Sequence, residues 1–234
     1  MLWQEDNKKA GFDVDDSVVD LLFNIECREL PVDHIYQLSQ AIHQALPGRA
    51  EDNELGVHPV HLAGSQNGWE RPDESLGQNL ILSKRTKLIL RVRKEHQQDV
   101  VDRLHNITLD IDGFEMTVKK PKVRKLRKDS TIFSRAIVCS ESETEDEMQF
   151  LNRMQQELAL MGIIIKKALC GKTSQFKTPD GPVLTRSLML ADMSPEDSVK
   201  LQQTGIGPLR DMGCGIFLPH KGIEAVGEST DDEK

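Results

Sequence analysis

The sequence has few aromatic residues and no long apolar run. Only 4% of its 234 residues are Phe, Trp or Tyr, and Tyr36 is the single tyrosine. The longest apolar stretches, such as 161–165, are far shorter than the roughly 20 residues needed to cross a bilayer. The N-terminus is acidic and lacks the basic start and apolar segment of a secretory signal. We therefore expect a cytoplasmic protein with no membrane partner.

The cysteines show no metal-binding or redox spacing. The four thiols, at 27, 139, 170 and 214, lie far apart and never form a C-x-x-C pair. That spacing argues against a structural zinc site or a redox dithiol. We expect no metal and no cofactor.

The charge is unevenly distributed along the chain. The net charge is −8, but three acidic segments, 1–20, 141–147 and 224–234, together carry −13, so the rest carries +5. Two basic windows hold much of that excess: 84–94 has six Lys or Arg and no acid, and 119–128 has seven in ten residues. Screening over about 10 Å lets such patches act independently of distant acidic segments. A polyanionic partner is therefore compatible with the negative total.

Hydrophobic periodicity divides the first half of the chain into strands and helices. Residues 17–28, rich in Val, Ile and Phe, predict a strand, and apolar residues at helical spacing predict a helix over 33–46. Further strands are expected at 56–63, 79–83 and 86–93, a short helix at 95–104, and a closing strand or hairpin at 107–118. The order is strand, helix, strand, strand, helix, strand.

The same order repeats in the second half. The pattern predicts a strand at 131–139, a helix at 144–161, strands at 163–169 and 183–192, a helix opened by Ser194-Pro195 and a strand at 216–218. Two βαββαβ units predict an α+β protein with two tandem ferredoxin-like domains. The expected division is a disordered 1–15, domains at 16–120 and 121–223, and a disordered acidic tail at 224–234.

A glycine-rich loop lies between the last helix and the last strand. Residues 205–215 contain four glycines around Arg210. Backbone without Cβ atoms can approach phosphate and present its amides, and an Arg can bind phosphate bidentately. A turn that only needs left-handed backbone angles is the alternative interpretation. The loop lacks the Gly-Lys-Ser/Thr of a Walker loop and, following a helix, is not a dinucleotide fingerprint.

Several segments resemble one protein family. The 201–221 region, with its glycine-rich loop, closely resembles the C-terminal loop of the CRISPR repeat-processing endoribonucleases of the RAMP superfamily. Four further blocks look like those of one type I subfamily: 30–36, 68–72, 131–135 and 186–192. The resemblance covers about residues 17 to 223, and the family's two ferredoxin-like domains agree with the order predicted above.

The resemblance implies metal-independent cleavage of repeat RNA by attack of a ribose 2′-OH on the neighbouring phosphate. Family members usually place a histidine near the first helix, which His34 matches, and Tyr36 is a second candidate. An imidazole transfers protons near neutral pH. The product would stay bound by its 3′ stem-loop in a type I effector complex, next to the backbone subunit nearest the 3′ end.

The expected RNA contacts are basic, aromatic and glycine residues in four segments. They are Trp69, Arg71, Lys84, Arg85, Lys119, Lys120, Lys122, Arg124, Lys125, Arg127, Lys128, Gly205, Gly207, Arg210, Gly213 and Gly215. Lysines on strands also form ordinary solvated faces, and an aromatic anchor for its own loop is the alternative interpretation of Trp69.

Two alternatives belong to other classes. A noncatalytic RNA-binding subunit of the same complex would share the fold and the loop. A 2′,3′-cyclic phosphodiesterase would need H-x-S or H-x-T motifs, and none of the seven histidines is followed at the second position by Ser or Thr. The sequence therefore favours the endoribonuclease.

Overall fold

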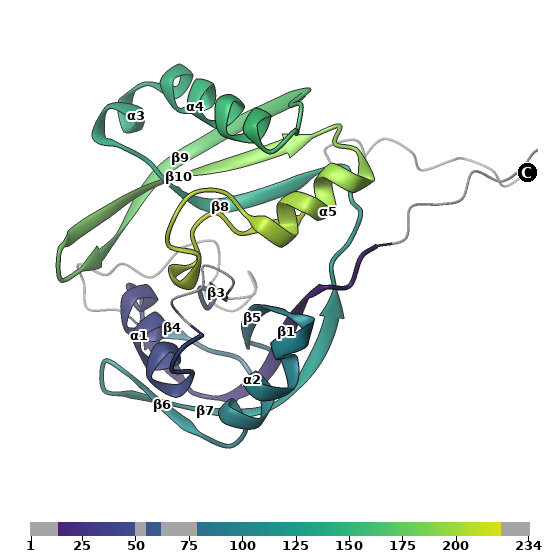
Figure 1. Ribbon diagram of the computed structural model, residues 1–234. Helices are drawn as coiled ribbons and strands as arrows, with labels where there is room; N and C mark the ends of the chain where they lie inside the picture. The colour runs from purple at the N-terminus through teal and green to yellow at the C-terminus, as the bar shows by residue number, and fades with distance from the viewer. Residues whose placement is uncertain (1–13, 50–54, 62–78, 221–234) are drawn as a thin grey trace, which may run out of the picture.

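The computed structural model describes residues 14–49, 55–61 and 79–220. Two α+β halves lie one above the other, with the first half below and the second above in Figure 1. Each half has its own cluster of buried apolar side chains. These two cores are the basis for treating the halves separately.

The first half is an antiparallel sheet covered by two helices. Its elements are β1 (Val18–Glu26), β2 (Glu29–Pro31), α1 (Ile35–Ala45), β3 (Gly56–His58), β4 (Asn79–Ile81), β5 (Lys87–Arg93), a 3-10 turn at Lys94–His96, α2 (Gln97–Leu104), β6 (Thr108–Ile111) and β7 (Phe114–Lys125). The main sheet has the order β3-β5-β1-β7-β6, and β2 pairs with β4 separately.

Strand register places the core of this half on one face of the sheet. Leu21 of β1 lies opposite Leu90 of β5 and Val123 of β7. Because directly opposed residues point to the same side, the alternate residues of β1 form one apolar surface. Leu38 and Ile42 of α1 pack on that surface and are almost fully buried.

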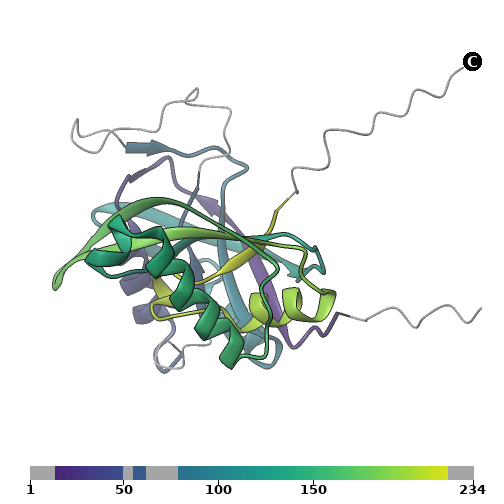
Figure 2. The same cartoon turned by 90° about the horizontal axis from the view of Figure 1, so that it is seen from above.

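The second half repeats the plan. Its elements are β8 (Ile132–Val138), α3 (Glu141–Glu145), α4 (Glu147–Leu160), β9 (Lys167–Thr178), β10 (Gly181–Ala191), α5 (Pro195–Thr204), a 3-10 turn at Arg210–Met212 and β11 (Phe217–Pro219). The sheet order is β11-β8-β10-β9. Viewed from above, α4 and α5 lie on the same side of this sheet (Figure 2).

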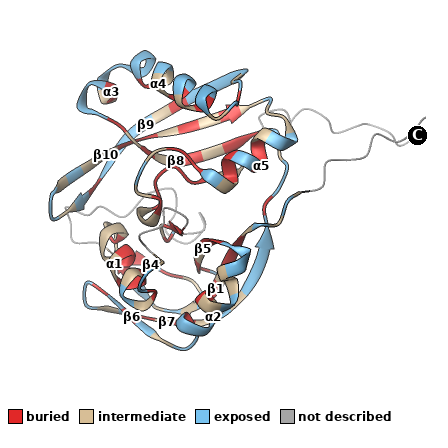
Figure 3. Ribbon diagram, in the orientation of Figure 1, coloured by how far each residue is buried: buried red, intermediate tan, exposed pale blue. Residues whose placement is uncertain are grey.

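Strand order confirms the predicted fold class. Without β2, β4 and β6, the strands of the first half lie in the order β7-β1-β5-β3 across the sheet, and those of the second half in the order β11-β8-β10-β9. In both halves this is the fourth, first, third and second strand in chain order. That is the arrangement of a βαββαβ ferredoxin-like unit. The buried residues concentrate on the strand faces that the helices cover (Figure 3).

The structure corrects four boundaries. The predicted helix at 144–161 is two helices, because Asp146 is extended and its carboxylate caps α4 by accepting from the amides of Met148 and Gln149. The strand predicted at 163–169 is β9, which begins at Lys167 and continues to Thr178 as a largely exposed polar strand. Asp15, expected to be disordered, accepts a hydrogen bond from Gln203.

The fourth correction concerns the join between the halves. The basic residues 121–125 were expected to begin the second domain, but they pair with β1 and complete β7. The chain leaves the first sheet only after Lys125 and enters the second at Ile132. A domain boundary at 120/121 would therefore cut strand β7. The alternation of apolar and polar residues could not show that the strand continues, because lysines lie on both of its faces.

Candidate active site and RNA-binding surface

His34 precedes α1 and is buried, in contrast to the expectation that it meets RNA. It is 3% exposed. Its Nδ1 lies 2.9 Å from the carbonyl oxygen of Pro31, and its Nε2 accepts a 3.0 Å hydrogen bond from the amide of Val60. This pairing fits a neutral ring with its proton on Nδ1. Burial and the engagement of both ring nitrogens within the protein argue against His34 as the proton-transfer group.

His43, in the last turn of α1, faces the glycine-rich loop. Its Nε2 lies 3.1 Å from Oδ2 of Asp211, and the two side chains are 26% and 19% exposed. An imidazole that donates Nε2–H to a carboxylate keeps Nδ1 as a proton acceptor. His43 is therefore oriented by the second half of the protein and still reachable from solvent.

Ser39 supports this pair. Its hydroxyl donates to Oδ2 of Asp211 at 3.0 Å and lies 3.5 Å from Nε2 of His43. The three residue types are those of a hydrolase triad, but here the serine is fully buried and donates to the carboxylate. Ser39 is thus a support for Asp211 and not a nucleophile.

Tyr36 lies on the same face of α1 as His43. Seven residues are two helical turns, or about 10 Å along the axis. Tyr36 lines a polar cavity of about 400 Å³ with Gln37, Gln40 and Gln44 of α1 and residues of the β6–β7 turn. His43 is not among the residues that line this cavity, so Tyr36 stays the second candidate that the family resemblance indicates.

Backbone geometry requires most glycines of the loop. Gly205, Gly207, Gly213 and Gly215 all have positive φ. A Cβ on Gly215 would lie 1.8 Å from the carbonyl oxygen of Ile206, one on Gly213 would lie 2.3 Å from Pro59 Cδ, and one on Gly205 would lie 2.7 Å from the carbonyl oxygen of Gly215. These three glycines are needed to fold the loop and dock it on the first half.

Gly207 is different because it opens to solvent. A Cβ there would meet nothing within 4 Å. Gly207 and Leu209 have φ of 71° and 62°, and their amides have no acceptor within the described part of the chain. Amides presented by left-handed backbone can form an anion-binding nest. Phosphate contact in the loop is therefore best supported at 207–209.

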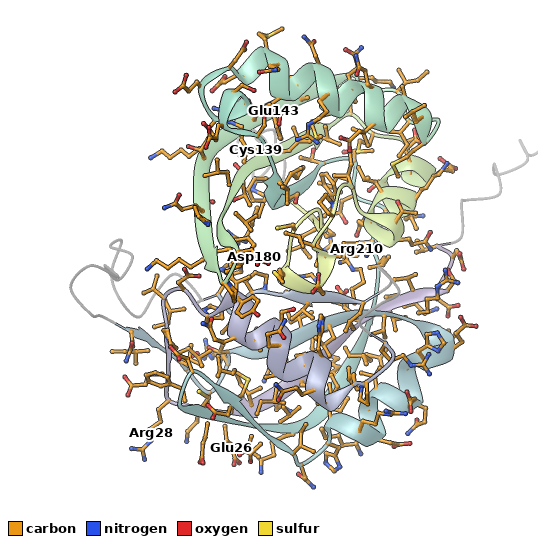
Figure 4. The ribbon with its side chains drawn as sticks, turned by 60° about the vertical axis from the view of Figure 1, so that its left-hand side comes forward. Glu26, Arg28, Cys139, Glu143, Asp180 and Arg210 are labelled. Carbon is orange, nitrogen blue, oxygen red and sulfur yellow. The ribbon has the colours of Figure 1, made fainter. Side chains whose placement is uncertain are left out.

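Arg210 is held inside the structure. It is 5% exposed and donates to the carbonyl oxygens of Gln203, at 3.0 Å, and Thr204, at the end of α5. A cation there complements the negative end of the helix dipole. Figure 4 shows Arg210 on the loop between the two halves. These contacts correct the expectation that Arg210 binds phosphate at the surface.

A buried ionic cluster joins the halves. Arg91 is fully buried, donates to both oxygens of Asp20 at 2.8 and 3.2 Å, and donates to the carbonyl oxygens of Gln202 and Phe217 at 2.9 and 2.8 Å. Burial alone raises the pKa of Asp20, but the charge and hydrogen bonds of Arg91 outweigh it and lower the pKa to about 2. The second half thus completes the pairing of a first-half arginine.

His58 lies beside this cluster and is uncharged at neutral pH. Its burial and the nearby charge of Arg91 lower the pKa of the imidazole to about 3. Its Nε2 is 3.8 Å from Asp20, too far for a hydrogen bond.

The basic segment 119–128 lies mostly along β7. Several of its cations already have acidic partners: Lys119 with Glu26, Arg124 with Asp20, Lys125 with Asp16 and Arg127 with Asp129. Lys120 and Lys122 are exposed and have no acidic partner among the described residues. Lys128 is also exposed. Within this segment, Lys120 and Lys122 are therefore the clearest positive charges that no acidic neighbour in the described part of the chain neutralises.

The remaining predicted contacts are scattered. Lys84 and Arg85 are exposed in the turn between β4 and β5. Trp69 and Arg71 lie outside the described residues. The pairing of His43 with Asp211 was not predicted. Ser39 and Tyr36 precede His43 by four and seven positions, and this spacing indicates one polar face of the helix. The carboxylate of Asp211 belongs to a distant segment, so the spacing could not predict it.

In residues 14–49, 55–61 and 79–220, no group of three or more His, Cys, Asp or Glu side chains is placed to hold a metal ion. Within the same ranges, no helix is long and apolar enough to cross a membrane.

The fold and this site define a tandem ferredoxin-like protein with its C-terminal glycine-rich loop docked against the first helix. The family model described as Cas6 CRISPR matches residues 19–222, and the chain belongs to that family. It is 28% identical over 201 residues to a Myxococcus xanthus (strain DK1622) protein named CRISPR-associated endonuclease Cas6, covering 86% of this chain and 81% of that protein.

Solved structures share the fold. The product of a Cas6-related gene from Pyrococcus furiosus has a TM-score of 0.60 at 15% identity, covering 86% of this chain and 97% of that one. A CRISPR-associated protein Cas6 has a TM-score of 0.61 at 11% identity, covering 87% and 99%. At such identities the similarity is one of architecture.

Proposed function

We propose that the protein is a metal-independent endoribonuclease that cleaves CRISPR repeat RNA and keeps the product bound by its 3′ stem-loop. Membership of the Cas6 family supports this, as does the endonuclease name of the Myxococcus relative. The observation that carries the catalytic part is the partly exposed imidazole of His43, held by Asp211 of the glycine-rich loop. The bound product would make the protein a cytoplasmic subunit of a type I complex, beside its backbone subunit.

The proposed reaction uses the nucleophile that RNA itself supplies. His43 takes the proton of a ribose 2′-OH, the 2′-oxygen forms a bond to the adjacent phosphorus, and the bond from phosphorus to the 5′-oxygen breaks. The departing oxygen takes up a proton, from the imidazolium or from water, giving a 5′-OH and a 2′,3′-cyclic phosphate. Asp211 stabilises the imidazolium that forms.

Cations and amides of both halves hold the RNA in this proposal. The open amides at Gly207 and Leu209 lie on the same loop as Asp211, so a phosphate bound there is close to His43. Lys120 and Lys122 extend the positive surface along β7. Lys84 and Arg85 are further candidates for RNA contact, and Tyr36 stays a second candidate for catalysis.

Cleavage in the presence of a chelator tests the function. Purified protein is expected to cut the repeat RNA encoded beside its gene equally well with EDTA and with Mg²⁺, because the proposed acid and base are side chains. Denaturing gels should show one cut per repeat, and phosphatase treatment should show a cyclic or opened 2′,3′-phosphate end. A strict Mg²⁺ requirement would contradict the mechanism.

The β7 surface makes a separate prediction about binding. Changing Lys120 and Lys122 together to alanine is expected to weaken RNA binding and to lower the slope of log affinity against log salt by about two, one for each lost phosphate contact. Arg103→Ala, which removes an exposed cation from α2, is the matched control. Equal affinity and slope in the double variant would remove β7 from the RNA surface.

The burial of His34 is the observation that favours a noncatalytic RNA-binding subunit as the second candidate. It removes the histidine that the family resemblance indicated. This second function would be established if the protein bound the repeat RNA tightly and did not cleave it in any of several assay buffers.

A further inference from the structure

An apolar row crosses the second sheet on the side away from its helices. Leu218 of β11 lies opposite Phe133 of β8, Phe133 opposite Met189 of β10, and Met189 opposite Leu169 of β9. Directly opposed residues of antiparallel strands point to the same face. The four side chains therefore form one continuous line across all four strands.

The flanking residues show which face this is. Ile132, Leu188 and Leu190, next to row members along the strands, point to the opposite side and pack with α4 and α5 in the core. Leu169 is 63% exposed, and the other row members are half-buried. Among the described residues, the row thus lies on the sheet face that the helices of this half leave uncovered.

A guanidinium and an imidazole lie beside the single aromatic ring of the row. The guanidinium carbon of Arg135 lies 6.0 Å from the centre of the Phe133 ring, within cation–π range. The ring of the exposed His220 is 5.9 Å from Phe133, with the planes inclined at 58°. A phenyl ring flanked by a guanidinium and an imidazole offers stacking area and positive charge, the two properties that bind unpaired nucleotides.

We propose that this row binds unpaired nucleotides that flank the repeat hairpin, with a base stacked on Phe133. The inference rests on the proposed function and adds single-stranded RNA as a second ligand of the same molecule. The row spans three inter-strand spacings, about 14 Å, which suits the two or three bases that an open four-stranded sheet commonly stacks. A stable protein interface needs about 800 Å² on each side, more than four side chains provide.

The connection between the halves leads RNA towards the row. β8 starts at Ile132, shortly after Lys128, the last cation of the basic segment. Phe133 is five positions after Lys128, at most about 18 Å of extended chain away, so RNA held along 119–128 would need only a few more nucleotides to reach the row. The 131–135 block therefore gains a role that the cleavage site leaves unassigned.

The test compares three RNAs by fluorescence anisotropy: the repeat hairpin alone, the hairpin with an unpaired adenylate extension at its 5′ end, and the hairpin with the same extension at its 3′ end. The wild-type protein is expected to bind one extended RNA more tightly. Phe133→Leu should lower the ratio of extended to hairpin affinity about tenfold, because stacking is lost while an apolar side chain remains. Phe133→Trp should keep the ratio. Leu160→Ala, a change at a 90% exposed apolar residue on α4, is the control.

Several results would overturn this inference. One is an unchanged ratio in Phe133→Leu, and another is an equal loss with all three RNAs. A third is a Phe133→Leu defect confined to assembly with other subunits, which would make the row a protein contact. In the wild-type protein, 4-thiouridine in the extension should crosslink to residues 131–135 or His220, and its failure to do so would also count against the row. Lack of any hairpin cleavage would instead sink the proposed function.

Discussion

Replacing His43 with alanine is expected to reduce cleavage of the repeat RNA by about 10²- to 10⁴-fold, the usual contribution of a general acid or base. RNA affinity should change little, because the imidazole adds at most one contact. Single-turnover cleavage with protein in excess measures the first quantity, and filter binding measures the second. Asp211→Asn should lower cleavage less, since the amide still positions the ring but no longer stabilises its charged form.

His34→Ala is the informative comparison. Loss of its hydrogen bonds to Pro31 and Val60 is expected to lower the melting temperature, with cleavage per folded molecule retained. His105→Ala, at the exposed end of α2, controls for removing a histidine. Wild-type cleavage in His43→Ala, or complete inactivity of a fully folded His34→Ala, would reverse the assignment.

Arg91→Ala should lower the free energy of unfolding by about 3 to 5 kcal/mol, because it leaves Asp20 as a buried charge without its main partner. It also removes the donor to the carbonyl oxygens of Gln202 and Phe217. Urea unfolding at pH 7 measures the loss. Arg93→Ala, two residues along the same strand, removes a 51% exposed arginine and should change stability by only about 0.5 kcal/mol.

The pH dependence of this effect has a definite sign. The folded pKa of Asp20, about 2, is below the ordinary value of 3.8. Its stabilising contribution is therefore complete above about pH 4 and is lost as the pH falls towards 2. In Arg91→Ala burial dominates and raises the carboxyl pKa, so the acid transition should move to higher pH. Similar losses in the Arg91 and Arg93 variants would show that the cluster does not join the halves.

The fold was largely predictable because local signals agreed with one another. Turn and capping residues such as Asp112-Gly113, Ser194-Pro195 and Gly205 lie where the elements begin or end. The errors fall where periodicity gives no information. β9 is polar on both faces over much of its length, and β7 continues through lysines. Pairing with a neighbouring strand, and not burial, keeps those residues extended.

The site was less predictable, since its geometry depends on contacts between distant segments. The family resemblance indicated a histidine near α1, but sequence could not show that His34 faces Val60 and that His43 faces Asp211, 168 positions later. Arg210 is a similar case. Its position among glycines predicted that it binds phosphate, but its guanidinium donates hydrogen bonds to backbone carbonyl oxygens at the end of α5.

The pairing of Arg91 has a consequence for synthesis on the ribosome. Its two carbonyl acceptors are made 111 and 126 residues later in the chain. During translation the nascent first sheet therefore already holds the Arg91–Asp20 pair but still lacks the two carbonyl acceptors of Arg91 Nη1. A nascent chain that stops before residue 217 lacks the Phe217 acceptor, so this part of the docking of the two halves waits until β11 has emerged.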